Sequence, residues 1–260
     1  MKQVLGRKHS LSNDRWLDAT ERIEELISQD EVDELAEEAA ERVRRVCAGK
    51  RAGYAYSGGK DSIVLADLVE RAGIHDGWFA WCDLDYPAFV RWIRQNKPTG
   101  VRMVHTGLDL PWLAEHQELI FARGKVGQRW HRYSQLGPFT DMYRKNGLDV
   151  LLLGHRVIDG NVCGDGGLIR KRDGETRFNP IYDWPHEAVL GYIHYHGLAL
   201  PPIYGWKDGY RQGTHAWPER DYCDTLDEGY RDVYEIDPGI VIDAARYISS
   251  ARRFLREVGA

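Results

Sequence analysis

The chain has 260 residues, a hydrophobic content of 43% and a formal net charge of −5 at pH 7. This length suits one large α/β domain with additions, and no apolar stretch approaches the roughly 20 residues that a membrane-spanning helix needs. The negative net charge argues against a protein whose whole surface binds nucleic acid.

The hydrophobic pattern predicts helices and strands that alternate along the chain. An acidic helical region covers residues 14–47. After it we expect strands at 53–56, 78–83, 101–105 and 149–153, and helices at 61–72, 86–97, 109–122 and about 131–146. Such alternation predicts an α/β fold with a doubly wound parallel sheet. We divide the chain into an N-terminal helical appendage (1–50), a nucleotide-binding α/β domain (51–200) and an irregular C-terminal lobe with a helix (201–260).

The strand at 53–56 leads into the most informative segment of the chain, Ser57-Gly58-Gly59-Lys60-Asp61-Ser62. Paired glycines let a backbone turn sharply and approach an anion, and the following helix offers free N–H groups and a positive dipole end. Lys60 adds a point charge, and Ser57 and Ser62 add hydroxyl donors. The spacing differs from that of a Walker loop, so the segment predicts a pyrophosphate-binding loop of another type.

Polar residues also follow two other predicted strands. Asp83 and Asp85 leave the second strand and could hold a ribose hydroxyl or a metal-bound phosphate, although an ordinary polar strand end is an equal alternative. Gly154, His155 and Arg156 follow the strand at 149–153, and an arginine presents a planar fork suited to phosphate or sulfate. Ligands of open α/β sheets bind beyond the carboxyl ends of the strands, where these groups would meet loop 57–62.

The segment 160–178 is rich in glycine and carries the basic triplet Arg170-Lys171-Arg172. We interpret it as a mobile loop that closes over a nucleotide. A solvated turn is an equal alternative for the triplet. A helix that opens at Pro185 and closes near Gly197 follows.

Several of these motifs occur in known proteins. The hexapeptide at 57–62 resembles the loop of the N-type ATP pyrophosphatases, the adenine nucleotide alpha hydrolase superfamily. The order of motifs over roughly residues 50–215 resembles the phosphoadenosine phosphosulfate (PAPS) reductase family: Gly154-x-Arg156, then Asn179-Pro180, Asp183-Trp184, Tyr192-Ile193 and a Leu-Pro-Pro-x-Tyr exit at 200–204. This resemblance implies a HUP-like sheet, nucleotide phosphates at 57–62, a second-strand contact from Asp83 or Asp85, and a functional Arg156.

The chain departs from that family in its cysteines. The family's reductases carry a nucleophilic cysteine in a Glu-Cys-Gly-Leu tail, whereas this chain ends in Arg-Glu-Val-Gly-Ala. Gly213 is followed by Thr214 and His215 rather than by the family's cysteine. Reduction of a sulfonucleotide needs a thiolate, and two carboxylates flank Cys223, so we expect no reductase. The four cysteines are scattered without a Cys-x-x-Cys pair, which fits a reducing cytoplasm.

We therefore predict an ATP pyrophosphatase-type adenylating transferase or ligase. Lys60, Asp61 and Arg156 are the predicted catalytic residues, and Asp61 is the predicted ligand of Mg²⁺. The predicted nucleotide contacts are Ser57, Gly58, Gly59, Lys60, Asp61, Ser62, Asp83, Asp85, Gly154 and His155. The bound nucleotide would be ATP or PAPS.

Other functions stay open at this point. A sulfonucleotide reductase or sulfotransferase is one alternative, and a non-catalytic nucleotide-binding scaffold is another. The acceptor is unknown. A nucleic acid is one candidate, whose phosphates Arg170, Lys171 and Arg172 and the terminal Arg252, Arg253 and Arg256 could contact. A homodimer formed through the N-terminal helices also stays open.

Overall fold

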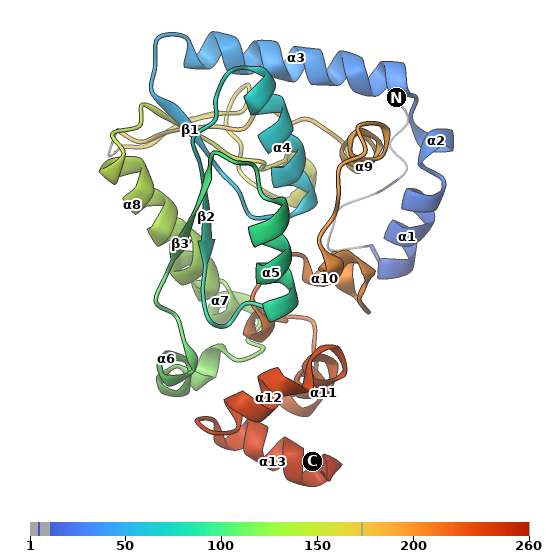
Figure 1. Ribbon diagram of the computed structural model, residues 1–260, viewed down its shortest axis with the longest axis vertical. Helices are drawn as coiled ribbons and strands as arrows, with labels where there is room; N and C mark the ends of the chain where they lie inside the picture. The colour runs from blue at the N-terminus through green and yellow to red at the C-terminus, as the bar shows by residue number, and fades with distance from the viewer. Residues whose placement is uncertain (1–4, 6–10, 173, 260) are drawn as a thin grey trace. The chain divides into compact units, whose positions relative to one another are not determined.

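The computed structural model describes residues 5, 11–172 and 174–259. Its centre is a six-stranded sheet with the strand order β3-β2-β1-β4-β6-β5 (Figure 1). The strands are β1 (Ala52–Ala55), β2 (Gly77–Trp81), β3 (Val101–His105), β4 (Val150–Leu152), β5 (Leu168–Arg170) and β6 (Thr176–Phe178). The pairs β1–β2, β1–β4 and β4–β6 are parallel, and β5–β6 is antiparallel. The predicted α/β fold with a mostly parallel sheet is confirmed.

Thirteen α-helices accompany the sheet in the described part of the chain. They are α1 (Asn13–Glu21), α2 (Ile23–Leu26), α3 (Gln29–Cys47), α4 (Lys60–Arg71), α5 (Pro87–Asn96), α6 (Leu110–Glu115), α7 (Gly124–Gly127), α8 (Gly137–Lys145), α9 (His186–Tyr195), α10 (Gly209–Gln212), α11 (Leu226–Ile236), α12 (Pro238–Ala244) and α13 (Ser249–Val258). Helices α4 and α8 lie on opposite faces of the sheet (Figure 1). Within the described residues, none of these helices combines the length and the apolar character that crossing a membrane requires.

The chain divides into two compact units. The first contains residues 1–79, 92–103 and 140–213, and the second contains residues 80–91, 104–139 and 214–260. These boundaries differ from the sequence-based segments 1–50, 51–200 and 201–260.

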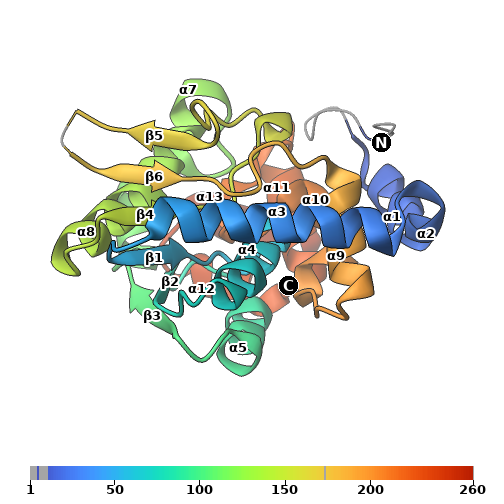
Figure 2. The same ribbon diagram turned by 90° about the horizontal axis from the view of Figure 1, so that it is seen from above.

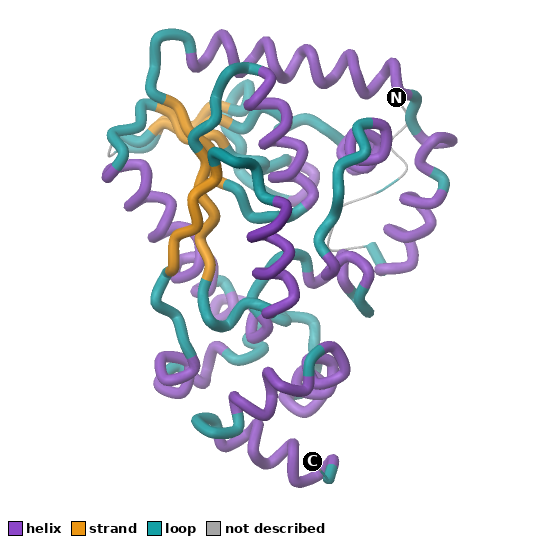
Figure 3. The backbone as a smooth tube through the Cα atoms, viewed as in Figure 1, coloured by secondary structure: helices purple, strands orange, loops and turns teal. Residues whose placement is uncertain are grey.

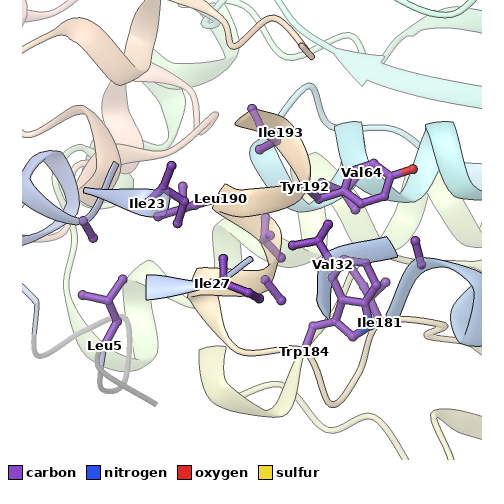
Figure 4. Close-up of a cluster of buried hydrophobic side chains, with 14 of the residues drawn as sticks. Leu5, Ile23, Ile27, Val32, Val64, Ile181, Trp184, Leu190, Tyr192 and Ile193 are labelled. Atoms are coloured by element: carbon purple, nitrogen blue, oxygen red, sulfur yellow. The ribbon is translucent and has the colours of Figure 1, made fainter. Parts of the chain in front are cut away.

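The N-terminal helices belong to the first unit because they bury apolar residues in its core. The predicted helical region at 14–47 consists of α1, α2 and α3. Ser28 begins α3 with a capping box, in which its hydroxyl accepts from the Glu31 amide and the Glu31 carboxylate accepts from the Ser28 amide. Helix α3 packs on α4 and α9, and α2 also packs on α9. Figure 4 shows this cluster, in which Ile23 and Ile27 lie near Leu190.

A glycine in each of β1 and β2 leaves room for an aromatic side chain of the neighbouring strand. A Cβ on Gly53 would come within 2.4 Å of the Trp78 ring, and a Cβ on Gly77 within 2.6 Å of the Tyr54 ring. The rings occupy the space that neighbouring side chains would otherwise take, so the sheet is tightly packed directly upstream of loop 57–62.

The sequence suggested that the glycine-rich segment 160–178 is a loop, but part of it forms regular strands. Its second half forms the β5–β6 hairpin, which extends the sheet beside β4 (Figure 2). Asn179 fixes the base of the hairpin, because its side-chain amide donates to the carbonyls of Cys163 and Gly167. Residues 160–167, before β5, are mostly irregular backbone, with one isolated bridge from Asp165 to Leu168.

The second unit contains the C-terminal helices α11, α12 and α13, which pack on one another. Figure 3 shows this C-terminal region as helices joined by loops. Its core is aromatic: the Phe121 ring contacts those of Trp217 and Tyr230, and Gly229 leaves room for Phe121. The C-terminal lobe is therefore more regular than its sequence suggested.

Candidate functional site

Loop 57–62 has the strand, turn and helix geometry that an anion site needs. Strand β1 ends at Ala55 and helix α4 begins at Lys60, with Gly59 as its N-cap. Gly58 has φ +68°, a left-handed conformation that costs little only for glycine. The first turn of α4 therefore presents backbone N–H groups and a positive dipole end at the loop.

The two serines of the loop hydrogen-bond to the loop itself. Ser62 Oγ accepts from the Ser57 amide and hydroxyl, both at 3.1 Å, and donates to the Gly59 carbonyl at 2.9 Å. Ser57 Oγ accepts from the Gly59 amide at 3.3 Å. These bonds fix the shape of the turn, so the serines have a structural task besides any contact with phosphate.

Lys60 is buried, with 3% of its surface exposed. Its Nζ lies 2.7 Å from Asp61 Oδ2 and 5.3 Å from the ring centroid of Trp16, which comes from α1. The Lys60 amide donates to the Tyr204 hydroxyl at 2.9 Å. Burial, followed by the charge of Asp61, raises the pKa of Tyr204, so this phenol stays protonated. The lysine thus contacts groups from three separate segments of the first unit.

Arg156 lies beside the loop and is completely buried. Its Nε is 2.8 Å from Asp61 Oδ1, and its Nη2 is 3.0 Å from Asp159 Oδ2. Nη2 also donates to His186 Nδ1 at 3.0 Å, and Nη1 donates to the Trp184 carbonyl at 3.2 Å. Since Nδ1 accepts this bond, His186 carries its proton on Nε2.

The guanidinium of Arg156 therefore links the end of β4 to the start of α4 and of α9. The contact with phosphate that the sequence predicted for Arg156 is untested. These contacts favour a positioning role, because Nη1 and Nη2 donate hydrogen bonds, Nε faces the Asp61 carboxylate, and no surface of Arg156 is exposed.

Gly154 explains how the loop after β4 can approach loop 57–62. A Cβ on Gly154 would lie 2.9 Å from the Asp61 carbonyl oxygen and 3.0 Å from its carbon. Only a glycine allows this approach of two backbones. The neighbouring His155 is partly exposed.

Asp83 and Asp85, the other predicted nucleotide contacts, lie in the second unit. Asp83 is exposed and its Oδ1 is 3.1 Å from His105 Nε2. Asp85 Oδ2 accepts from the Cys82 amide at 2.8 Å, and desolvation, with a smaller effect of Glu219, raises the pKa of Asp85 to about 7. Asp85 thus stabilises its own turn, and a nucleotide contact by either carboxylate stays a prediction.

The loop does not fit a magnesium ion held by the protein. Both oxygens of Asp61 face cations, Oδ1 the Arg156 guanidinium and Oδ2 the Lys60 ammonium. Among the described residues, no group of three or more His, Cys, Asp or Glu side chains could hold a metal ion. Magnesium is bound by oxygen ligands such as carboxylates, and the Asp61 carboxylate is already neutralised by Lys60 and Arg156.

None of the four cysteines has the environment of a nucleophile. Burial raises the pKa values of Cys47, Cys163 and Cys223 to about 11, and it raises the pKa of Cys82 as well. Around Cys163 the charge of Asp159 adds to this effect. These thiols are protonated at neutral pH.

Sequence reasoning missed Trp16 and gave no role to His186. The Pro-Pro-x-Tyr exit that ends in Tyr204 marked an ordered turn, and His186 follows the predicted start of a helix. Trp16 sits in an acidic helix far from any motif. No sequence pattern near Trp16 indicates that it lies beside loop 57–62.

Comparisons with known proteins agree with this architecture. The family model described as "Phosphoadenosine phosphosulfate reductase domain" matches residues 51–212. A solved structure, the phosphoadenylyl-sulfate (PAPS) reductase from Candida auris in a phosphate complex, matches with a TM-score of 0.50 and 16% sequence identity. That match covers 68% of this chain and 91% of the Candida protein, and at this identity it shows a shared fold alone. A search of curated proteins finds no match.

Proposed function

The chain belongs to the phosphoadenosine phosphosulfate reductase domain family, and we propose that it is an enzyme that binds ATP or a related adenine nucleotide at loop 57–62. The observation that carries this proposal is the start of α4, where Gly58 turns the backbone, Gly59 caps the helix and Lys60 adds a positive charge. Helix N-termini with an adjacent lysine are suited to the phosphates of nucleotides. The nucleotide phosphates would lie against this first turn.

We propose adenylation as the reaction. An oxygen atom of the acceptor attacks the α-phosphorus of ATP and forms a new P–O bond. The bond from the α-phosphorus to the bridging oxygen breaks, and its electron pair leaves with pyrophosphate. The α4 N-terminus and the Lys60 ammonium favour this step because they stabilise the negative charge that grows on the leaving group.

Arg156 and Asp61 have a positioning role in this proposal. Asp61 receives one cation on each carboxylate oxygen, so it fixes the direction of the Lys60 side chain relative to Arg156. A catalytic cation that is held in place loses less entropy in the transition state. Arg156 would act through Asp61 rather than on the substrate.

The state of the thiols supports adenylation over sulfonucleotide reduction. Reduction by the protein would need a thiolate to attack sulfur, and burial keeps the pKa of Cys163, the cysteine next to Arg156 and Asp159, near 11. PAPS still qualifies as a ligand, because it shares the adenine nucleotide phosphates with ATP.

The test combines binding and turnover. Wild type, Lys60→Met and Lys145→Met are titrated with ATP and with PAPS by calorimetry, with and without magnesium chloride. Lys145 is an exposed lysine paired with Asp141 and serves as the matched control. We expect wild type and Lys145→Met to bind ATP equally, and Lys60→Met to bind at least about tenfold more weakly, since a hydrogen bond to a charged group is worth about 1.5–3 kcal/mol.

Product analysis then separates the candidate reactions. Release of pyrophosphate from ATP, alone or with added carboxylic acids and RNA as acceptors, supports adenylation. Release of sulfite from PAPS in the presence of a small thiol would instead support a sulfonucleotide reductase. Binding of neither nucleotide would overturn the proposal.

A further inference from the structure

The first helix supplies part of the wall of the phosphate loop, although it precedes the matched family region 51–212. Trp16 lies in α1 and is 1% exposed. Its ring is the surface over which the Lys60 ammonium lies, at 5.3 Å from the centroid. A desolvated ammonium over the face of a tryptophan is a favourable cation–π arrangement.

Trp16 also contacts the group that holds Arg156. The His186 ring meets it edge-on, with centroids 4.5 Å apart and an interplanar angle of 78°. His186 Nδ1 is the acceptor for Arg156 Nη2. One indole ring therefore limits the movement of both cations next to Asp61.

A second connection runs through two tyrosines. Trp16 stacks on Tyr210 with centroids 5.3 Å apart and an angle of 4°, and Tyr210 contacts the Tyr204 ring at 4.8 Å. Tyr204 is the acceptor of the Lys60 amide. Helix α1 thus reaches the side chain of Lys60 directly and its backbone through the ring contacts from Trp16 to Tyr210 and from Tyr210 to Tyr204.

Helix α1 is fixed in this place by polar contacts on either side of Trp16. Asn13 Oδ1 accepts from the Tyr210 amide at 3.0 Å, and the Thr20 hydroxyl lies 3.1 Å from the Tyr210 hydroxyl. Ser12 caps the helix by accepting from the Arg15 amide. The indole is consequently held from both ends of its helix.

From these contacts we propose that Trp16 is a positioning residue that holds the Lys60 ammonium in place for nucleotide phosphates. The indole face shields the ammonium from water and directs it toward Asp61, and the T-shaped contact with the indole holds His186 against Arg156. The phosphate site of this chain therefore requires α1. This inference rests on the proposed nucleotide site at loop 57–62, but the position of Lys60 can be measured without any nucleotide.

The experiment compares Trp16→Phe, which keeps an aromatic face, with Trp16→Leu, which keeps apolar volume but has no ring. Trp217→Phe is the control, because Trp217 is equally buried and lies in the aromatic core of the second unit. The first readout is the rate at which acetic anhydride acetylates the Lys60 amine of the folded full chain, followed by mass spectrometry of the proteolytic peptide that contains Lys60. We expect about a tenfold faster reaction in Trp16→Leu than in Trp16→Phe or the control.

The second readout is the dissociation constant for ATP. It should rise about tenfold in Trp16→Leu and change by less than about threefold in Trp16→Phe. Equal acetylation rates in the Leu and Phe variants would overturn the positioning role, whatever the nucleotide data show. If wild type binds no nucleotide, the proposed function fails while the acetylation rates still decide whether Trp16 holds Lys60.

Discussion

The backbone amide of Lys60 donates a 2.9 Å hydrogen bond to the phenol of Tyr204, a residue 144 positions further along the chain. This amide belongs to the first turn of α4, where helices leave their N–H groups without partners from the helix itself. Tyr204 satisfies that donor and keeps its own proton, which it can offer to another acceptor. A phosphate oxygen that approached the Lys60 amide would meet the Tyr204 hydroxyl at the same place.

The first prediction concerns Tyr204→Phe. The change leaves the Lys60 amide without its acceptor, so we expect a loss of about 1–3 kcal/mol in the free energy of unfolding. Saturating ATP should recover part of this loss, because a phosphate oxygen then accepts from the amide. Urea unfolding of wild type and Tyr204→Phe, with and without ATP, measures the loss. An equal loss of unfolding free energy with and without ATP would contradict the prediction.

The sequence predicted the strand, turn and helix around loop 57–62, because most of the residues that shape them are close in sequence. Gly58 and Gly59 permit the turn, and the apolar spacing after Lys60 builds the helix within a dozen residues. The same holds for Gly154 and Arg156, which follow a short buried strand that joins β1 in the sheet. A parallel sheet brings such strand ends to one edge, so the neighbourhood of these residues follows from the strand order.

The contacts between distant segments could not be predicted in this way. Trp16 reaches Lys60 because the N-terminal helices pack on α9, and that packing depends on shape at Gly191, where a Cβ would meet Ile27 at 2.7 Å and Val32 at 3.0 Å. The sequence likewise indicated that Arg156 faces phosphate, since a guanidinium suits an anion. Its burial among two carboxylates and a histidine is a tertiary property.

A second prediction addresses the ion pairs of Arg156. Arg156→Met should lower the free energy of unfolding by about 3–5 kcal/mol, because it leaves Asp61 and Asp159 without their buried partner. The double variant Arg156→Met/Asp159→Asn should lose less than the sum of the single changes, with a coupling of about 0.5–3 kcal/mol. Arg44→Ala, which breaks an exposed pair with Glu37, should cost less than about 1 kcal/mol.

A third prediction follows from the raised pKa of Asp85. Its pKa of about 7 in the folded chain lies above the value of about 3.9 of an unfolded aspartate, so the folded protein holds this proton more tightly. The stabilisation from this group is complete below pH 4 and is lost as the pH rises through 7. Asp85→Asn should therefore flatten the decline of unfolding free energy between pH 4 and 7 in urea titrations. An unchanged slope would show that another group titrates.

The fourth prediction concerns the thiols. With pKa values of about 11 for Cys47, Cys163 and Cys223, the folded protein should react only slowly with Ellman's reagent at pH 7.5. Unfolding in urea should release all four thiols. Because the folded-state pKa values are raised, unfolding free energy should also fall from about pH 8.5 upward, as unfolded thiols ionise. A thiol that reacts within seconds in the native chain would reopen the reductase alternative.

The last prediction uses the close approach of Gly154 to Asp61. In Gly154→Ala the new methyl group would lie 2.9 Å from the Asp61 carbonyl oxygen, and neither backbone can move without shifting the loop or β4. We expect a loss of about 1–3 kcal/mol in unfolding free energy from this overpacking. The affinity for ATP should fall by at least about tenfold, because the start of α4, which carries Lys60 and Asp61, moves relative to Arg156.

Gly147→Ala provides the matched control for this change. Gly147 has φ +58° and no atom within 4 Å of an added Cβ, so alanine there strains the backbone by about 1–2 kcal/mol without a clash. It lies between α8 and β4, at the opposite end of the strand from Gly154. If both variants lose similar unfolding free energy but only Gly154→Ala binds ATP more weakly, the geometry of loop 57–62 causes the weaker binding. Equal ATP affinity in the two variants would mean that the contact between Gly154 and Asp61 serves the fold and not the site.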